Sequence, residues 1–288
     1  MIRRFLPRRA SWAALGAELA AWQAAGVQPC LWWRDDDAVA DSPALERLLT
    51  LARRHQVPIA LAVIPAAIDR SLAGALRRHG ETAVVYQHGV DHIDRAGGPA
   101  RGEFPADMAS AALAGRLREG WDMLADAVPG VMPVIVPPWN NVGPNLLVAA
   151  RAAGYAGISA YGRGSHMAGG LRRIDCQVDV LTWRGGPRFK GEGRLLRQLI
   201  GELRTRRRQG RLLDPVGVLT HHRDMGDPET WDFLEILLER TAGAAAWVEP
   251  WPSLRNRLGA AIAATPSLDF EMVSQPAWRR SGGALLEG

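Results

Sequence analysis

The chain has 288 residues, of which 47% are hydrophobic and 23% are charged. These fractions are close to those of ordinary globular domains, so they exclude intrinsic disorder for the bulk of the chain. The formal net charge is +5, but part of the basic excess stands in two arginine clusters, at residues 1–10 and 204–211, which are typical of solvated faces rather than of a nucleic-acid interface.

Residues 11–26 form the first predicted element, an amphipathic helix. Arginines precede it, as in an export signal, but Glu18 and Gln23 are not compatible with an apolar export core. No stretch reaches the ~18 uninterrupted apolar residues that a membrane helix needs. We therefore expect a cytoplasmic protein with no membrane partner, in which residues 1–27 precede the main domain.

Short β-rich runs then alternate with helical segments rich in Ala, Leu and Arg. The predicted strands cover residues 30–33, 59–63, 84–87, 134–136, 157–159, 176–180, 216–220 and 246–248. The predicted helices cover residues 43–55, 67–79, 105–127, 143–153, 190–209 and 228–241. Most of the strand runs are apolar throughout, which is typical of parallel strands that are buried on both faces.

This alternation predicts a parallel α/β sheet. Seven or eight such units in about 250 residues favour closure into a (β/α) barrel over an open sheet. Because no internal linker interrupts the pattern, we expect one barrel domain over residues 28–264 and an irregular tail over residues 265–288. The two cysteines, Cys30 and Cys176, lie in apolar runs and are interpreted as inert core thiols.

Three adjacent carboxylates, Asp35, Asp36 and Asp37, directly follow the first predicted strand. The carboxyl ends of the strands are where barrel enzymes place their chemistry. Adjacent carboxylates repel one another, so they need a cation, or one of them must hold a proton. A helix N-cap cluster is the alternative, but Asp41 and Ser42 already suffice for the next helix.

Two histidines four residues apart, His88 and His92, follow the apolar run at residues 84–86. Their neutral imidazoles can converge on one divalent ion, and Gly89 lets the backbone turn sharply beside it. Taken alone the pair is a weak signal, and two exposed loop histidines are the alternative. No His-Glu-x-x-His segment is present, so a zinc-protease helix is not indicated.

Three further strand ends carry polar or aromatic side chains: Pro138–Asn140, Asp179 with Trp183, and His221 with His222. Each has a structural explanation, such as a turn or a hydrogen-bonded histidine. Five polar strand ends together indicate a functional site instead. Tryptophan is also abundant, with 11 Trp against 5 Phe and 3 Tyr, and four of them stand at these ends: Trp32, Trp33, Trp139 and Trp183. Indole rings can stack on sugars, although core packing is the better explanation for any single one.

In this order and spacing the five segments resemble the polysaccharide deacetylases of carbohydrate esterase family four. That family shows an aspartate pair, a His-x-x-x-His, an Arg-Pro-Pro-Tyr-type loop, an Asp…Trp segment and a Leu-x-His at successive strand ends. The resemblance covers roughly residues 28–250. It implies a distorted (β/α) barrel, often of seven strands, and metal-dependent removal of acetyl groups from N-acetylated sugars.

The resemblance also implies a ligand set for one divalent ion. By analogy, His88, His92 and one carboxylate of Asp36 or Asp37 hold the metal. The small residue that follows the family's aspartate pair favours Asp37 as the ligand, Asp36 as the general base and Asp35 as a supporting acid. The register with Asp35 as the base and Asp36 as the ligand stays open.

Further roles follow from the same analogy. His221 matches the family's general acid, with His222 as the fallback, and Asp179 matches the carboxylate that orients and charges that histidine. Trp139 and Trp183 match the aromatic walls of the acetyl pocket.

A site of this composition supports amide hydrolysis. An ion with three protein ligands keeps positions for water and for the substrate carbonyl, lowers the pKa of the water to about 7 and polarises the carbonyl. Asp36 would take the proton of the water, His221 would protonate the leaving amine, and a backbone N–H after Pro138 would help the metal to hold the oxyanion. Pro138 and Asn140 are thus expected to contact the substrate. Zinc is the expected ion, with cobalt, iron or nickel as alternatives.

Three positions depart from the family pattern. The arginine of the third motif, which supports the base, is Val136 here, so tuning of the base depends on a substitute such as Arg34 or Arg184. The second acid of the Asp…Trp segment is Thr182, and residues 38 and 39 are Ala-Val instead of Gly-Pro. Together with the missing export signal, these changes indicate a divergent branch whose substrate need not be a wall polymer.

Two alternative functions stay open. A carbohydrate-binding barrel that has lost turnover would fit the changes at Val136 and Thr182. A hydrolase of small non-sugar amides or imides would use the same site. The expected partner is therefore an acetylated sugar or a small amide, nucleic acid is not expected, and the sequence indicates no oligomeric state.

Overall fold

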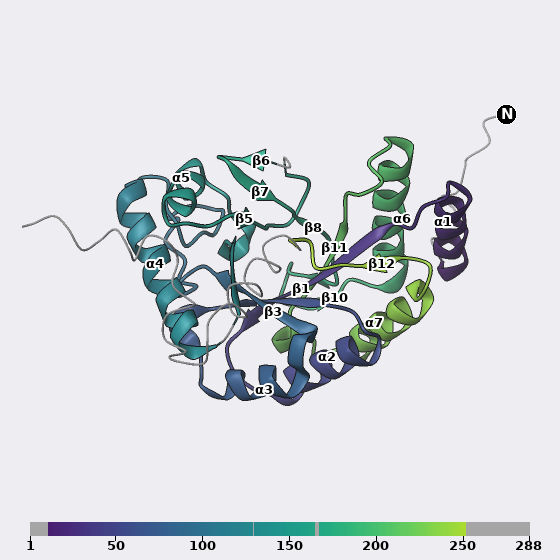
Figure 1. The fold of residues 1–288 in the computed structure, drawn as a ribbon, viewed down its shortest axis with the longest axis horizontal. Coiled ribbons are helices and arrows are strands. Elements are labelled where there is room, and N and C mark those ends of the chain that lie inside the picture. Colours follow the sequence, from purple (N-terminus) through teal and green to yellow (C-terminus); the bar gives the residue numbers. More distant parts are fainter. Residues whose placement is uncertain (1–10, 129, 165–166, 252–288) are drawn as a thin grey trace, which may run out of the picture.

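The computed structural model describes residues 11–128, 130–164 and 167–251, in which strands alternate with helices (Figure 1). Seven parallel strands form the main sheet: β1 (Cys30–Ala38), β2 (Ile59–Val63), β3 (Ala83–His88), β4 (Val131–Val136), β5 (Gly157–Ile158), β8 (Cys176–Asp179) and β11 (Val216–Thr220). The remaining strands have two or three residues. In the same sheet, β7 (Leu171–Arg173) and β12 (Ala246–Trp247) pair in parallel and β6 (Met167–Ala168) pairs antiparallel, while β9 (Leu181–Thr182) and β10 (Arg188–Phe189) form a separate two-stranded sheet.

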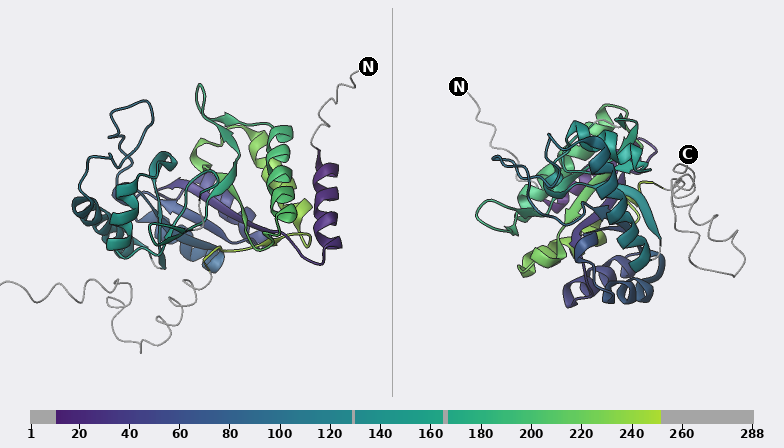
Figure 2. Two further views of the ribbon diagram at one scale, coloured as in Figure 1. Left: turned by 90° about the horizontal axis from the view of Figure 1, so that it is seen from above. Right: turned by 90° about the vertical axis from the view of Figure 1, so that its left-hand side faces the viewer.

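Helices cover the outside of this sheet (Figures 1 and 2). They are α1 (Trp12–Ala24), α2 (Pro43–Arg54), α3 (Ser71–His79), α4 (Ser110–Ala127), α5 (Pro144–Ala152), α6 (Glu192–Arg208) and α7 (Pro228–Thr241). Short 3₁₀ turns link several elements: η1 (Pro65–Ala67), η2 (Gly80–Thr82), η3 (Pro138–Asn140) and η4 (His222–Asp224). None of the described helices is long and apolar enough to cross a bilayer.

The sheet curls until its two ends meet. Its order is β5-β4-β3-β2-β1-β11-β8, with β7 on the other side of β5. Only two residues separate β7 from β8, so this segment pairs with the β5 region along one edge and with β11 along the other. Cys176 N donates to Ala160 O at 2.9 Å, and Gly162 N donates to Cys176 O at 2.8 Å. The predicted distorted (β/α) barrel is therefore confirmed.

An aromatic cluster fills the barrel near the beginnings of its strands. The Trp251 ring packs edge-on against Trp32, with centroids 6.0 Å apart, and against Tyr86 at 5.3 Å. A Cβ at Gly217, on β11, would lie only 2.5 Å from Trp32 Nε1. Trp32 and Trp33 are fully buried, so these two tryptophans belong to the core and not to a substrate site. The other end of the barrel is left for polar groups.

The boundaries of several elements differ from the predicted ones. The first strand does not stop before the aspartates but continues to Ala38, because Asp35 pairs with Thr220 of β11 and with Leu61 of β2. The helix predicted from residue 67 begins at Ser71, whose N–H is accepted by Asp69 Oδ1 at 2.8 Å. The helix predicted from residue 105 begins at residue 110, after a turn at residues 105–108.

Ion pairs join the N-terminal helix α1 to α6. Glu18 is buried on α1 and lies 3.2 Å from Arg204 Nε and 2.9 Å from Arg207 Nε. Arg206 is buried as well and pairs with Glu202 at 2.7 Å. The interpretation of residues 204–211 as a solvated face is therefore wrong for Arg206, whereas Arg204 stays exposed and Arg207 is half-buried. The first ten residues and the predicted tail lie outside the described residues.

The two cysteines differ in environment. Cys176 is fully buried in the barrel, where burial raises the pKa of its thiol, as expected of an inert core thiol. Cys30, at the start of β1, is only partly buried.

Candidate metal and catalytic site

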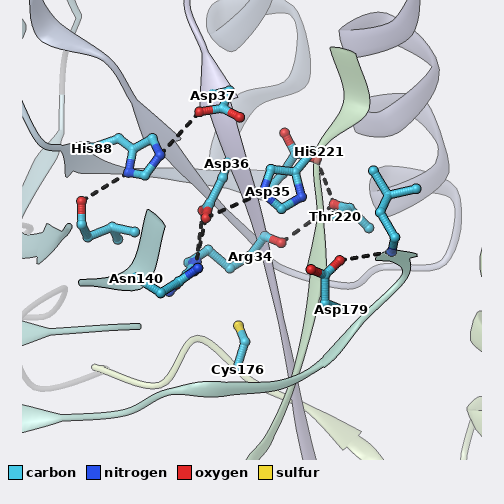
Figure 3. Close-up of polar contacts among 12 residues, drawn as sticks. Arg34, Asp35, Asp36, Asp37, His88, Asn140, Cys176, Asp179, Thr220 and His221 are labelled. Carbon is cyan, nitrogen blue, oxygen red and sulfur yellow. Dashed lines mark hydrogen bonds and ion pairs between the residues drawn. The ribbon is translucent and has the colours of Figure 1, made fainter. Parts of the chain in front are cut away.

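Polar side chains gather at the carboxyl ends of β1, β3, β8 and β11 (Figure 3). Since these strands run parallel in one curled sheet, their carboxyl ends lie at the same rim of the barrel. Asp37 faces His88 there, while Asp36 lies between Arg34, Asn140 and His221. The structure thus brings the predicted residues of several distant segments together.

The metal-binding group predicted from the sequence is compact. Asp37 Oδ1 lies 3.2 Å from His88 Nε2 and 3.3 Å from His92 Nε2, and the three ligand atoms all lie within 4.8 Å of one another. Asp37 Oδ1 is buried and accepts no well-formed hydrogen bond from the described residues. Two imidazole nitrogens around such a carboxylate oxygen form a donor set that suits a divalent transition-metal ion.

Backbone contacts and conformation aim these ligands. His88 Nδ1 donates to Val136 O at 2.9 Å, which leaves Nε2 directed at Asp37. Asp37 and His92 both have left-handed backbone conformations, with φ of 68° and 56°. Such conformations are uncommon for residues other than glycine and are found in strained functional regions.

The ionisation of the group also fits cation binding. Burial would raise the pKa of Asp37, but the nearby His88 ring and the charges of His221 and His92 lower it far below its usual range. Burial would lower the pKa of His88, yet Asp37 and Asp36 raise it. His92 has a lowered pKa because of burial and the charge of His88. These pKa shifts favour the ionised form of the Asp37 carboxylate, and of the two imidazoles His92 gives up its proton more readily than His88.

Asp36 is held by a buried arginine of its own strand. Arg34 Nη2 donates to Asp36 Oδ2 at 2.9 Å, and Arg34 Nε lies 2.8 Å from Asp36 Oδ1, so the guanidinium contacts both carboxylate oxygens. Arg34 also donates to Ser159 Oγ at 2.6 Å and to Asn140 Oδ1 at 3.0 Å. Of the two predicted substitutes for the arginine missing at Val136, Arg34 thus contacts the carboxylate.

The other substitute, Arg184, is exposed. Both oxygens of Asp36 face a guanidinium, while Asp37 faces the two histidines. This geometry agrees with the register in which Asp37 is the ligand and Asp36 is the base.

Asp35 points to the opposite side of β1 and joins a second buried pair. Its carboxylate lies 2.5 Å from His222 Nδ1 and accepts from His222 N at 3.0 Å and from Thr220 Oγ1 at 2.6 Å. Burial would lower the pKa of His222, but the charge of Asp35 raises it. His222 is thus committed to a structural contact, unlike its neighbour His221.

His221 lies beside Asp36, with 3.8 Å between His221 Nε2 and Asp36 Oδ2. Its Nδ1 is buried and makes no hydrogen bond with the described residues. Asp179 accepts from Leu181 N at 2.8 Å and from Trp183 Nε1 at 2.9 Å. The Trp183 ring in turn packs against His221, with centroids 4.7 Å apart. Trp183 therefore stands between Asp179 and His221, and no direct hydrogen bond joins Asp179 to His221.

The predicted substrate contacts divide into two kinds. The ring centroids of Trp139 and His92 lie 4.5 Å apart, and Trp183 is 45% exposed, so both indoles border the site. Pro138 is buried, and Asn140 Oδ1 is occupied by Arg34. The side chains of Pro138 and Asn140 consequently support the site more than they face it.

A pocket of about 320 Å³ adjoins the metal-binding group and is lined by Asp37, Ile64, His92, Arg223 and Asp224. Of these, Ile64, Arg223 and Asp224 were assigned no role from the sequence, nor was Ser159, which accepts from Arg34. Arg223 and Asp224 directly follow the predicted pair His221 and His222, whereas Ser159 stands in no recognisable motif and reaches the site through the position of its strand.

Comparison with solved structures identifies the fold. The chain superposes on a protein from Mycobacterium smegmatis assigned as a polysaccharide deacetylase with a TM-score of 0.57 and 16% identity, covering 84% of this chain and 94% of that one. A family 4 carbohydrate esterase from Streptomyces lividans in complex with acetate gives 0.50 and 13%, covering 77% and 94%. A family 4 acetyl xylan esterase from Clostridium thermocellum in complex with a cobalt ion gives 0.50 and 12%, covering 80% and 92%.

The chain has the fold of the family 4 carbohydrate esterases. The resemblance noted in the sequence is thereby confirmed at the level of the fold. No family model matches the sequence, and no curated protein matches it either. Such low similarity agrees with a divergent branch.

Removing one candidate ligand should weaken metal binding so far that the ion is lost on dialysis. We expect His88→Ala, His92→Ala and Asp37→Asn each to lose the divalent ion, because three ligands hold it, whereas Asp36→Asn and His221→Ala should keep it. Metal analysis of each dialysed variant measures this. Retention by Asp37→Asn together with loss by Asp36→Asn would shift the ligand by one residue.

Removing Arg34 should destabilise the fold. Arg34→Met leaves the Asp36 carboxylate buried and unpaired, which should lower the free energy of unfolding by about 3–5 kcal/mol in urea denaturation. Exposed Arg184→Met is the matched control and should stay within about 0.5 kcal/mol of the wild type. Adding Asp36→Leu to Arg34→Met should recover most of the loss. A fully stable Arg34→Met variant would contradict the importance of this ion pair.

Proposed function

We propose that this protein is a metal-dependent hydrolase that removes an acyl group, acetyl in the first instance, from the nitrogen of an N-acylated sugar. One observation carries the proposal: the cluster of Asp37, His88 and His92 lies beside a carboxylate, Asp36, that a buried arginine holds and that His221 approaches to 3.8 Å. Metal ligands, a base and an acid are the parts that amide hydrolysis requires. Complexes of proteins with this fold with acetate and with cobalt agree with it.

The roles follow from the surroundings of each group. A divalent ion held by Asp37, His88 and His92 would supply Lewis-acid polarisation and a more acidic water. Asp36 cannot turn away, because both of its oxygens contact Arg34, and it accepts the proton of the attacking water. Zinc remains the expected ion, with cobalt, iron or nickel as alternatives.

His221 is the proposed proton donor to the leaving amine. Its ring is fixed by packing against Trp183 and not by a hydrogen bond to Asp179, so its polar atoms stay available to the reaction. His222 does not share this freedom, since Asp35 holds its Nδ1.

The proposed substrate is an N-acetylated sugar because two indole rings border the site. Trp139 lies against the ligand His92 and Trp183 against His221, so a flat apolar ring face could be held between the metal and the acid. Small non-sugar amides are the alternative substrates. Because Arg34 makes the contact with Asp36 that Val136 cannot make, we favour an active enzyme over a binding barrel that has lost turnover.

Acetate release tests this function. Purified protein is stripped with a chelator, reloaded with Zn²⁺ or Co²⁺, and offered N-acetylglucosamine oligomers and a panel of small amides. We expect release from the sugars that stops on chelation and returns with the metal. Release from small amides alone would reassign the substrate class. Stoichiometric metal binding without any release would favour the binding barrel.

The acid and base should be separable from the metal ligands. Asp36→Asn and His221→Ala should each lower kcat/KM by about 10²–10⁴, the range for a positioned acid or base, with metal content unchanged. His222→Ala shows whether the proton donor is His221 or the neighbouring histidine. Full activity in His221→Ala with none in His222→Ala would move the acid by one residue, and full activity in both would remove proton donation from this loop.

A further inference from the structure

Glu103 is a buried acid that no sequence motif marks. It lies in the long connection between β3 and α4, and only 1% of it is exposed. Its carboxylate accepts from three successive backbone N–H groups: Val90 at 2.9 Å, Asp91 at 3.3 Å and His92 at 3.1 Å. The last of these residues is a candidate metal ligand.

Three successive amides can point at one anion only if the backbone curls around it. The left-handed φ of 56° at His92 belongs to this curl. An L residue adopts this conformation at a cost, so something must hold it there. Among the described residues, the side chain that all three amides contact is Glu103.

Gly89 shows how closely the carboxylate is fitted. A Cβ at this position would lie 2.1 Å from Glu103 Oε2 and 2.5 Å from Pro138 Cγ, and the residue itself has φ of 59°. Glu103 and Pro138 therefore both occupy the space where a side chain of residue 89 would stand. The Glu103 carboxylate thus lies directly against the backbone of the segment that carries His88 and His92.

Charged contacts fix Glu103 to the neighbouring helix. Arg116 of α4 places Nη2 3.7 Å from Glu103 Oε1 and 3.0 Å from Asp91 Oδ2. Arg95 binds the same Asp91 carboxylate at 2.6 Å. The Glu103 carboxylate thus connects α4 with the loop that carries His92.

We infer that Glu103 is a positioning residue of the metal centre, which holds His92 next to Asp37 through the backbone of residues 90–92 and so sets the affinity for the ion. The inference rests on the proposed metal site. Groups that orient ligands in this way typically change metal affinity by about 10- to 100-fold when they are replaced.

Glu103→Gln tests the inference at nearly constant side-chain volume. The amide NH₂ cannot accept from the backbone, so apo protein titrated with Zn²⁺ should bind about 10- to 100-fold more weakly than the wild type. Asp94→Asn is the matched control and should bind as the wild type does. Asp94 also accepts two backbone N–H groups of this loop, from Ala96 at 3.1 Å and Gly102 at 3.0 Å, but neither belongs to a candidate ligand.

A double-mutant cycle separates positioning from general support. In a His92→Ala background, Glu103→Gln should change the residual Zn²⁺ affinity no further, because the ligand that it positions is gone. Losses that simply add would overturn the inference. If Glu103→Gln does not fold, Glu103→Asp, which keeps the charge and is one methylene shorter, takes its place in the same cycle.

The outcomes also separate this inference from the proposed function. A wild-type protein that binds no Zn²⁺ would remove the metal site, and both proposals with it. A wild type that binds Zn²⁺ with the same affinity as Glu103→Gln would overturn the role of Glu103 alone.

Discussion

The buried ion pair of Arg34 and Asp36 is the interaction on which the rest of the site depends. Desolvating two charges inside a barrel is costly, and the cost is offset only when their hydrogen-bonding groups are occupied. Both terminal nitrogens of Arg34 donate hydrogen bonds, to Asp36, Ser159 and Asn140, which come from β1, the end of β5 and the loop after β4. One guanidinium thereby ties three separate segments together and fixes where the proposed base stands.

The alternation of side chains along β1 explains why three neighbouring aspartates have three different environments. Successive residues of a strand point to opposite faces, so Arg34 and Asp36 share the barrel interior, while Asp35 faces the outer layer. Asp35 there pairs with His222. Asp37 does not follow this alternation, because its φ of 68° turns its side chain towards the histidines. The mutual repulsion of the three carboxylates is relieved by three separate partners: an arginine, a histidine and the proposed metal centre.

The same alternation shows how much the sequence could predict. Apolar runs identified the seven main strands, and Ser42 marked the start of α2 because its side chain caps Leu45 N. The candidate ligands could be proposed because Asp37 and His88 stand at strand ends and His92 follows His88 by four residues. Glu103 could not, since its contacts depend on how a long loop folds back, and no local pattern encodes that. Nor could the continuation of β1 through its aspartates, because charged residues in a strand interior require partners from strands that are distant in the sequence.

Backbone strain is concentrated where the proposed chemistry lies. Five non-glycine residues in the described part of the chain have a positive φ. Four of them lie in the metal-binding group or beside it: Asp37, His92, Trp139 and Asn140. Each such conformation costs on the order of 1–3 kcal/mol and persists only where surrounding contacts enforce it. Glu103 accepts from the backbone N–H of His92, and Arg34 donates to the side chain of Asn140. A barrel built only for stability would lose nothing by relaxing these residues, so their clustering at one rim is itself an argument that the geometry serves binding and catalysis.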